Sequence, residues 1–163
     1  GRHEWFWEPG DEDHLFPVAD LMNMYEKSVG RNATLIMGLT PDTSGLLPEV
    51  DVRRLQEWGD AIRSKYGTPL YETSGEGNVL EIKFDQPSTI DRVVIQEDIT
   101  KGERVEDYSL EVLQGGEWVE VERGSCIGHK RIVMLEPLMA RAIRLKVYKN
   151  SVITSKIKIK VFN

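Results

Sequence analysis

The sequence of 163 residues contains a single cysteine, Cys126. One thiol excludes an internal disulfide framework and any metal site built from several thiolates. No apolar run approaches the roughly 18 residues that a membrane-spanning helix needs. Low-complexity tracts and internal repeats are also absent. These absences predict a globular chain that folds without disulfides and has no membrane span.

Basic residues are too few for a general nucleic-acid binder. The chain has 21 Lys and Arg against 27 Asp and Glu, which gives a net charge of −6. Neutralising the phosphates of a nucleic acid requires a basic face, so we expect no nucleic-acid partner. Apolar residues make up 40% of the chain and charged residues 29%, a composition typical of a folded protein and not of a disordered one.

One segment has the residue types of a weak metal site. His14 follows three consecutive acidic residues at 11–13. One imidazole and a few carboxylates in a loop are more typical of a solvated surface than of a metal centre. We therefore predict no metal and no cofactor.

Residues 1–68 have the pattern of an α/β unit. Apolar residues recur at three- and four-residue steps over about residues 17–29, which predicts an amphipathic helix. Residues 33–38 form an apolar run without polar alternation, typical of a strand buried on both faces of a parallel sheet. A second amphipathic helix is predicted between residues 48 and 67, because a proline begins this segment and a glycine ends it.

The predicted strand needs hydrogen-bond partners on both edges and cover on both faces. Residues 1–68 supply no other strand of this type, so the helix–strand–helix unit resembles a slice of a larger α/β sheet or barrel. We expect residues 34–37 to be paired by a second copy of the chain, by an edge of the second domain or by an exchanged segment.

Residues 69–163 have the period-two alternation of antiparallel strands. Short alternating segments separated by turn signals predict a sandwich, and Gly115-Gly116 marks the clearest hairpin. The fold class is therefore α+β, with domains at 1–68 and 69–163. The predicted strands are 79–84, 90–96, 108–113, 118–122, 131–135, 142–148 and 156–162.

Several separated motifs resemble, in the same order, the C-terminal part of bacterial α-L-fucosidases of glycoside hydrolase family 29. The resemblance covers essentially the whole chain. The motifs are Trp5-Phe6-Trp7, SVGRNATLIMGLTPD at 28–42, GLLPE at 45–49, IQEDI at 95–99, GERV at 102–105 and IGHKRI at 127–132. Many members have an asparagine in the strand motif where this chain has Gly38.

The resemblance implies the end of a (β/α)8 catalytic barrel followed by a galactose-binding-like, discoidin-like jelly roll. It also implies hydrolysis of terminal α-L-fucose with retention, through a covalent glycosyl–enzyme intermediate. Such chemistry needs two carboxyl groups about 5 Å apart. In the family both lie upstream of the part represented here, so we expect this chain alone to be inactive and name no catalytic residue.

Two tryptophans are the candidate substrate-binding residues that the resemblance implies. Trp5 and Trp7 lie in the motif that lines the fucose pocket of the family, and an indole ring can cover the apolar methyl face of a 6-deoxy sugar. Their alternative is a place in the core of the barrel. Tyr108, Trp118 and Tyr148 fall on alternating strand positions and are predicted to lie in the sandwich core.

Polar residues of the sandwich motifs are candidates for sugar or interdomain contacts. Arg104, His129 and Arg131 can hold hydroxyl or carboxylate groups by hydrogen bonds. The alternative is a network of ion pairs that fixes the hairpins or joins the sandwich to the barrel. We favour this structural role, because we identify no exposed aromatic platform for a sugar nearby.

Three functions remain open for the chain. It is a C-terminal fragment of an α-L-fucosidase, a stand-alone carbohydrate-binding module, or a structural domain that docks against the barrel. The first implies a fucosylated glycan and the missing remainder of the barrel as partners. The family also implies a periplasmic or extracellular location.

Overall fold

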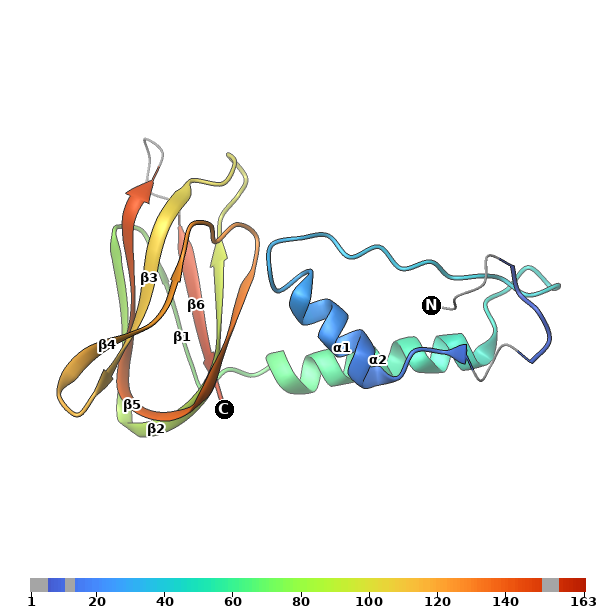
Figure 1. Cartoon of the computed structure of the whole chain (residues 1–163), viewed down its shortest axis with the longest axis horizontal. Helices are drawn as coiled ribbons and strands as arrows, with labels where there is room; N and C mark the ends of the chain where they lie inside the picture. The colour runs from blue at the N-terminus through green and yellow to red at the C-terminus, as the bar shows by residue number, and fades with distance from the viewer. Residues whose placement is uncertain (1–5, 11–13, 151–155) are drawn as a thin grey trace. The chain divides into compact units, whose positions relative to one another are not determined.

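The computed structural model describes residues 6–10, 14–150 and 156–163. The chain divides into two compact units (Figure 1). The helical unit consists of residues 1–28 and 33–68, and the sandwich unit consists of residues 29–32 and 69–163. The short segment 29–32 therefore folds with the sandwich, although both of its sequence neighbours belong to the helical unit.

The helical unit contains α1 (Val18–Lys27) and α2 (Glu49–Tyr66), which confirms both predicted helices. A proline immediately precedes each helix, and its fixed φ suits the first helical turn. The two helices are joined by side chains near their C-terminal ends. The Glu26 carboxylate accepts hydrogen bonds from Lys65 Nζ and from the Tyr66 hydroxyl, each at 2.6 Å.

The predicted strand at residues 33–38 is wrong. In the described part of the chain, residues 33–40 have no strand or bridge assignment and form the long connection between α1 and α2 (Figure 1). The Ile36 side chain is 86% exposed. A parallel strand exists only through hydrogen bonds to neighbours, and the described residues provide no neighbour for this segment. The expected pairing of residues 34–37, including pairing with a second copy of the chain, was therefore also wrong.

The sandwich unit contains six described strands, paired antiparallel in the order β1-β6-β2-β5-β3-β4. The strands are β1 (Tyr71–Gly75), β2 (Val79–Glu97), β3 (Val105–Gln114), β4 (Glu117–Gly124), β5 (Arg131–Asn150) and β6 (Ile157–Phe162). Together with the two helices they confirm the predicted α+β class and its antiparallel sheet.

The long strands β2 and β5 each run through both layers of the sandwich. Residues 79–83 of β2 pair with residues 142–146 of β5, whereas residues 92–95 of β2 pair with residues 131–134. The register shifts after Lys83, between these two parts. One layer therefore contains β1, β6, the end of β2 and the start of β5. The other contains the start of β2, the end of β5, β3 and β4.

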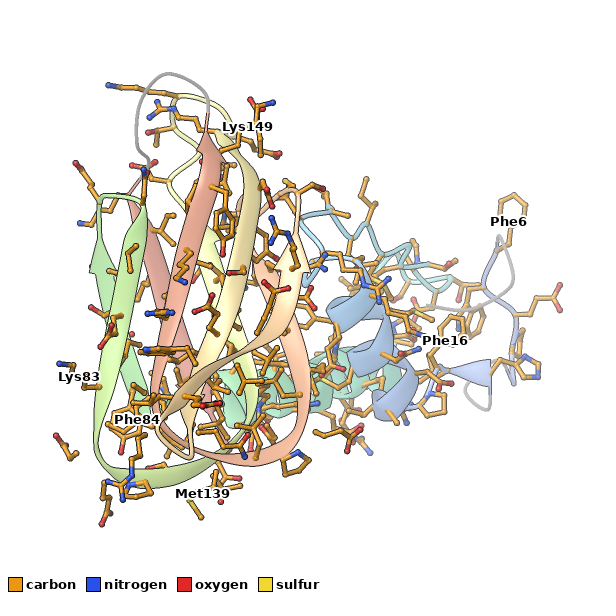
Figure 2. All side chains as sticks on the ribbon, turned by 60° about the vertical axis from the view of Figure 1, so that its left-hand side comes forward. Phe6, Phe16, Lys83, Phe84, Met139 and Lys149 are labelled. Atoms are coloured by element: carbon orange, nitrogen blue, oxygen red, sulfur yellow. The ribbon has the colours of Figure 1, made fainter. Side chains whose placement is uncertain are left out.

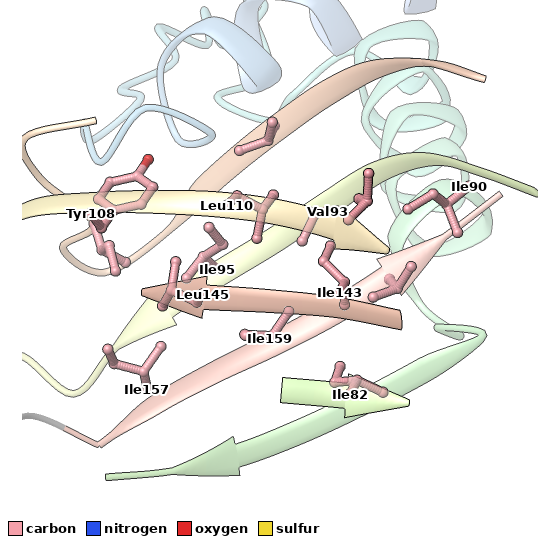
Figure 3. Close-up of a cluster of buried hydrophobic side chains, with 14 of the residues drawn as sticks. Ile82, Ile90, Val93, Ile95, Tyr108, Leu110, Ile143, Leu145, Ile157 and Ile159 are labelled. Carbon is pink, nitrogen blue, oxygen red and sulfur yellow. The ribbon is translucent and has the colours of Figure 1, made fainter. Parts of the chain in front are cut away.

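The core lies between these two layers, as Figure 3 shows. Because successive residues of a strand point to opposite faces, every second side chain enters the core. Ile95 and Ile159 come from one layer, and Leu110, Ile143 and Leu145 come from the other. All five are at most 1% exposed. This burial on both faces of the interior explains why the alternating segments fold into two covered sheets.

Two features of the strands differ from the sequence prediction. Segments 79–84 and 90–96 form one bent strand, and so do 131–135 and 142–148, because the chain continues its ladder through each bend. β1 was not predicted, since its sequence YETSG is polar. The predicted Gly115-Gly116 hairpin is confirmed, with φ of 61° and 91° in the left-handed region that its tight turn requires.

The three aromatic residues predicted for the core have different environments. Tyr108 is fully buried and Trp118 is half-buried, whereas Tyr148 is 50% exposed. The core placement of Tyr148 is therefore wrong. Val147 is buried as the partner of Tyr108, and the next residue along β5 must point to the outer face. There the Tyr148 hydroxyl lies 3.0 Å from Ser109 Oγ.

Candidate functional site

The two polar sandwich motifs meet at one end of the sandwich unit. They lie in the loop after β2, residues 98–104, and in the loop between β4 and β5, residues 125–130. The backbone N–H of Glu97 donates a hydrogen bond to the carbonyl of Gly128 at 2.9 Å. This bond ties the two loops together at their bases.

Residues 29–32 are attached to the start of β5. The backbone N–H of Ile132 donates to the carbonyl of Gly30 at 2.7 Å, and Arg31 forms an isolated antiparallel bridge with Arg131. Asn32 then turns the chain with a φ of 64°, the one non-glycine residue with positive φ in the described ranges. Asparagine tolerates this conformation better than most residues.

The Asn32 side chain links both loops. Its Oδ1 accepts a hydrogen bond from the backbone N–H of His129 at 2.7 Å, and its Nδ2 donates to Glu103 Oε1 at 2.8 Å. Gly128, with a φ of 60°, lies so close that a Cβ there would overlap the Asn32 amide group. The motif SVGRN therefore has a structural role in this unit, because its asparagine joins three separate segments.

Glu103 and Cys126 complete this polar cluster. The Cys126 thiol donates to Glu103 Oε2 at 3.2 Å. Hydrogen bonds from Asn32 and Cys126 hold the pKa of Glu103 below its ordinary value. Burial and the hydrogen bond to Glu103 raise the pKa of Cys126 to about 11. The thiol is thus protonated at neutral pH and is a poor nucleophile.

Arg131 forms an ion pair with Glu122 on β4, with Nη2 2.9 Å from Oε1. This hydrogen bond raises the pKa of the Arg131 guanidinium, so its charge is permanent. The nearby Tyr108 is fully buried, and burial raises the pKa of its hydroxyl. The Arg131 side chain therefore holds two strands together at the loop end of the sandwich.

The structure gives separate positions to the three residues predicted for sugar or interdomain contacts. Arg104 is half-buried, and its backbone N–H donates to Glu97 Oε1 at 2.8 Å. His129 has an exposed side chain, and its backbone N–H is bound to Asn32. Arg131 is bound to Glu122. These contacts connect loops and strands, which supports the structural alternative more than a shared sugar site.

A cavity of about 320 Å³ opens at the ends of β1, β2 and β6. Its volume is at the lower end of the range typical for small-molecule sites, about 300–1,000 Å³. All of its lining residues are polar, and none is aromatic. They are Ser74, Gln96, Glu97, Asp98, Lys156 and Lys158.

Several groups of this cavity are held in place by the surrounding structure. Asp98 Oδ1 accepts the backbone N–H of Thr100 at 3.0 Å, and hydrogen bonds to Thr100 lower the pKa of Asp98. Lys158 Nζ lies 3.2 Å from Glu72 Oε2. The sequence indicated these lysines only as the wet face of an alternating strand. Because β1 itself was not predicted, no sequence signal placed Ser74 beside them.

Of the two predicted substrate-binding tryptophans, Trp5 lies outside the described residues. Trp7 belongs to the helical unit and is half-buried. Its indole N–H is buried and has no hydrogen-bond partner among the described residues, and the same holds for the indole of Trp58. A buried indole N–H usually finds an acceptor, so both helical-unit tryptophans have an unmet hydrogen bond.

A search for grouped ligands among the described residues finds no set of three His, Cys, Asp or Glu side chains placed to hold a metal ion. In the same residues, no helix combines the length and the apolar character needed to cross a membrane.

Sequence comparison identifies relatives that are much longer than this chain. No protein-family model matches it. α-L-Fucosidase 1 of Arabidopsis thaliana is 26% identical over 185 residues, a match that covers 91% of this chain and 36% of the plant protein. The chain thus spans about a third of the length of this curated relative.

Structural comparison finds the same kind of protein. A crystal structure from Bacteroides thetaiotaomicron, assigned as an α-L-fucosidase, matches the whole chain with 44% identity and a TM-score of 0.94, over 37% of its own length. A glycoside hydrolase family 29 member from an unknown rumen bacterium matches 99% of the chain at 29% identity and a TM-score of 0.81, over 31% of its length. The homologues and structural neighbours are α-L-fucosidases, which confirms the predicted resemblance to the C-terminal part of such enzymes.

Proposed function

We propose that this chain is the C-terminal, non-catalytic region of a family 29 enzyme that hydrolyses terminal α-L-fucose from glycans with retention. Residues 1–68 are the end of its catalytic barrel, and residues 69–163 are an ancillary galactose-binding-like sandwich. One observation carries this proposal. The whole chain superimposes on a fucosidase-assigned structure with a TM-score of 0.94 but covers only 37% of it.

The helical unit supports its assignment to a larger barrel. Ile36, Leu46 and Phe6 are 86%, 70% and 81% exposed, and Figure 2 shows Phe6 pointing away from the ribbon. Apolar side chains of this size gain about 1.5–3 kcal/mol each when they are buried. The neighbouring strands and helices of a complete barrel provide the cover that these residues need.

The catalytic carboxylates lie, in this proposal, in the part of the enzyme outside this chain. A retaining mechanism requires one carboxylate as nucleophile and one carboxylic acid as acid/base, about 5 Å apart across the scissile bond. The carboxylates of the polar loop end already have structural partners. Glu97 accepts backbone N–H groups, Glu103 accepts Asn32 and Cys126, and Glu122 binds Arg131.

Trp5 and Trp7 are the residues of this chain that we assign to the fucose pocket of the complete enzyme. The buried, unpaired indole N–H of Trp7 supports the assignment, because a sugar hydroxyl or a residue of the missing barrel can accept it. Arg104, His129 and Arg131 keep the sandwich loops in place. We further propose a periplasmic or extracellular location, where fucosylated glycans are accessible.

The proposal is tested with an aryl α-L-fucoside as substrate. The 163-residue chain should release no fucose above background, whereas the product of the longer reading frame that includes it should release fucose. Turnover by the chain alone would overturn the assignment. So would a longer product with no α-L-fucosidase activity.

A tryptophan pair tests the assigned pocket residues in the longer product. Trp7→Ala should lower kcat/KM about tenfold or more, because it removes apolar contact with the sugar. Trp118→Ala is the matched control, since Trp118 lies in the sandwich with the Arg144 guanidinium 4.0 Å from its ring centroid. Equal effects of both changes would contradict the role of Trp7.

A further inference from the structure

We propose that the polar cavity at the ends of β1, β2 and β6 binds one neutral sugar residue through its hydroxyl groups. This inference rests on the ancillary role proposed above and gives that role a ligand class. The site uses none of the residues assigned to the fucose pocket. It also differs from the sugar contacts predicted at Arg104, His129 and Arg131.

The lining determines the kind of ligand. A carboxylate accepts hydrogen bonds only, an ammonium group donates only, and hydroxyl and amide groups do both. Asp98, Lys156 and Ser74 thus offer all three types around one space of about 320 Å³. A sugar ring presents neighbouring hydroxyls that donate and accept in the same way. A lining without aromatic residues holds such a ring by hydrogen bonds and not by stacking.

The charge of the cavity argues against an anionic ligand. Two lysines line it, but Lys158 already forms an ion pair with Glu72, and two acidic residues, Glu97 and Asp98, line it as well. The lowered pKa of Asp98 keeps its carboxylate ionised at neutral pH. Together with Glu72, the local balance is negative, so a sulfate or carboxylate ligand would be repelled.

The fixed geometry of the acceptors favours binding. Asp98 is held by the N–H of Thr100, and Glu97 is held by the N–H groups of Arg104 and Val105 at 2.8 and 3.3 Å. Pre-positioned groups lose little conformational freedom when a ligand arrives. Because the cavity is open and polar, we expect weak binding, with a Kd on the order of 1–10 mM.

The experiment is an NMR titration of the full 163-residue chain with three neutral probes. These are the methyl glycosides of D-galactose, D-mannose and D-xylose, which differ in the arrangement of neighbouring hydroxyls. At least one should shift the backbone amide signals of Ser74, Gln96, Asp98 and Lys158 with a saturable curve. Sodium sulfate is the rival probe. Shifts at these amides with sulfate and with no glycoside would overturn the proposal.

Two matched pairs of variants locate the site. Asp98→Asn and Lys156→Gln should each weaken binding about tenfold, the effect of losing one charge-assisted hydrogen bond. Asn can keep the local turn at residue 98, so the fold is preserved. Asp42→Asn changes a similar turn carboxylate in the helical unit, and Lys160→Gln changes a lysine outside the cavity. Neither control should alter the Kd.

The outcomes separate this inference from the proposed function. Glycoside binding that survives both Asp98→Asn and Lys156→Gln would place the sugar elsewhere and overturn the proposal, and so would the absence of any glycoside-induced shift. In the longer, active product, Asp98→Asn should leave hydrolysis of a small aryl fucoside unchanged. Loss of that hydrolysis would assign the carboxylate to catalysis instead.

Discussion

The helical unit and the sandwich unit contain apolar residues of the same kinds but bury them very differently. In the described helical unit, Leu21 is the one hydrophobic residue that is fully buried, at 1% exposed. All other buried hydrophobic residues of the described chain belong to the sandwich unit. Large apolar side chains such as Ile36 and Leu46 remain mostly exposed in the helical unit.

The difference shows that a second layer matters more than apolar content. In the sandwich, β2 and β5 run from one sheet into the other, so each layer covers the inner face of its partner. In the helical unit, α1 and α2 have no sheet to cover among the described residues of that unit. An amphipathic helix gains most of its stability from burying its apolar face, so these helices depend on what covers them.

The largest expected effect compares one leucine in each unit. Leu110→Ala removes a side chain with 0% exposure from the sandwich core and should lower the free energy of unfolding by about 2–5 kcal/mol. Leu46→Ala removes a side chain that is 70% exposed and should change it by less than about 0.5 kcal/mol. Urea denaturation of both variants measures the difference. Similar losses would mean that the helical unit has a packed core after all.

A second pair compares two glycines with positive φ. Gly128→Ala should cost about 2–4 kcal/mol, because the new Cβ overlaps the Asn32 amide in addition to the backbone strain. Gly45→Ala in the helical unit, with a φ of 79° and open space around it, should cost only about 1 kcal/mol. Thermal unfolding of both variants measures these costs.

The double variant Asn32→Gly with Gly128→Ala sharpens this comparison. Glycine keeps the positive φ at residue 32 and removes the amide that the new methyl group meets. The two changes should therefore cost less together than the sum of the single costs. Strict additivity would contradict the close contact between these residues.

The third expected effect concerns pH. Desolvation raises the pKa of Glu111, but hydrogen bonds and charges from Lys146 and Arg144 outweigh it, so the pKa lies below its ordinary value. A carboxylate of this kind stabilises the fold above pH 4.5, its unfolded value, and this contribution is lost as the pH falls through the lower folded value. Glu111→Gln should cost about 1–2 kcal/mol at pH 7 and progressively less below pH 4.5.

Urea unfolding of the wild type and of Glu111→Gln between pH 3 and 7, two conditions that bracket this window, checks the effect. Asp42→Asn in the helical unit is the control, because hydrogen bonds to Ser44 also lower the pKa of Asp42, at an exposed turn. Its pH dependence has the same sign but should be smaller, since water screens an exposed group. A constant difference between wild type and Glu111→Gln at every pH would contradict the ion-paired role of Glu111.

The elements predicted correctly from the sequence are those whose signal is local. Helical periodicity before Gly30 and Gly67 identified both helices, and Gly115-Gly116 identified the hairpin. The strand predicted at residues 33–38 failed because a strand depends on partners that local pattern does not include. β1 failed for the opposite reason, since its pairing with β6 compensates for a polar sequence.

The candidate site was less predictable, because its parts come from distant segments. The sequence indicated polar motifs around Arg104 and His129, and the structure does bring their loops together through Glu97 and Gly128. The link through Asn32 was not foreseen, since the family resemblance placed this residue at the start of a barrel strand. The cavity was not foreseen either, because it depends on the ends of three strands that are joined only in the folded sheet.

The smallest expected effect compares a thiol in each unit and requires no change in stability. Burial and Glu103 raise the pKa of Cys126 to about 11, so alkylation by iodoacetamide at pH 8 should be slow and should accelerate only in strong base. A cysteine placed at the exposed Thr43 of the helical unit, in a Cys126→Ser background, should titrate near the ordinary thiol value of about 8.5. Rates measured between pH 7 and 11 give both pKa values.

Glu103→Gln separates the two causes of the raised thiol pKa. Loss of the negative acceptor should lower the pKa of Cys126, while the remaining burial should keep it above that of the Thr43→Cys thiol. If Cys126 reacted as fast as the exposed thiol at pH 8, the loop end of the sandwich would be open to water. The contrast between a closed sandwich and an open helical unit would then be limited to the strands.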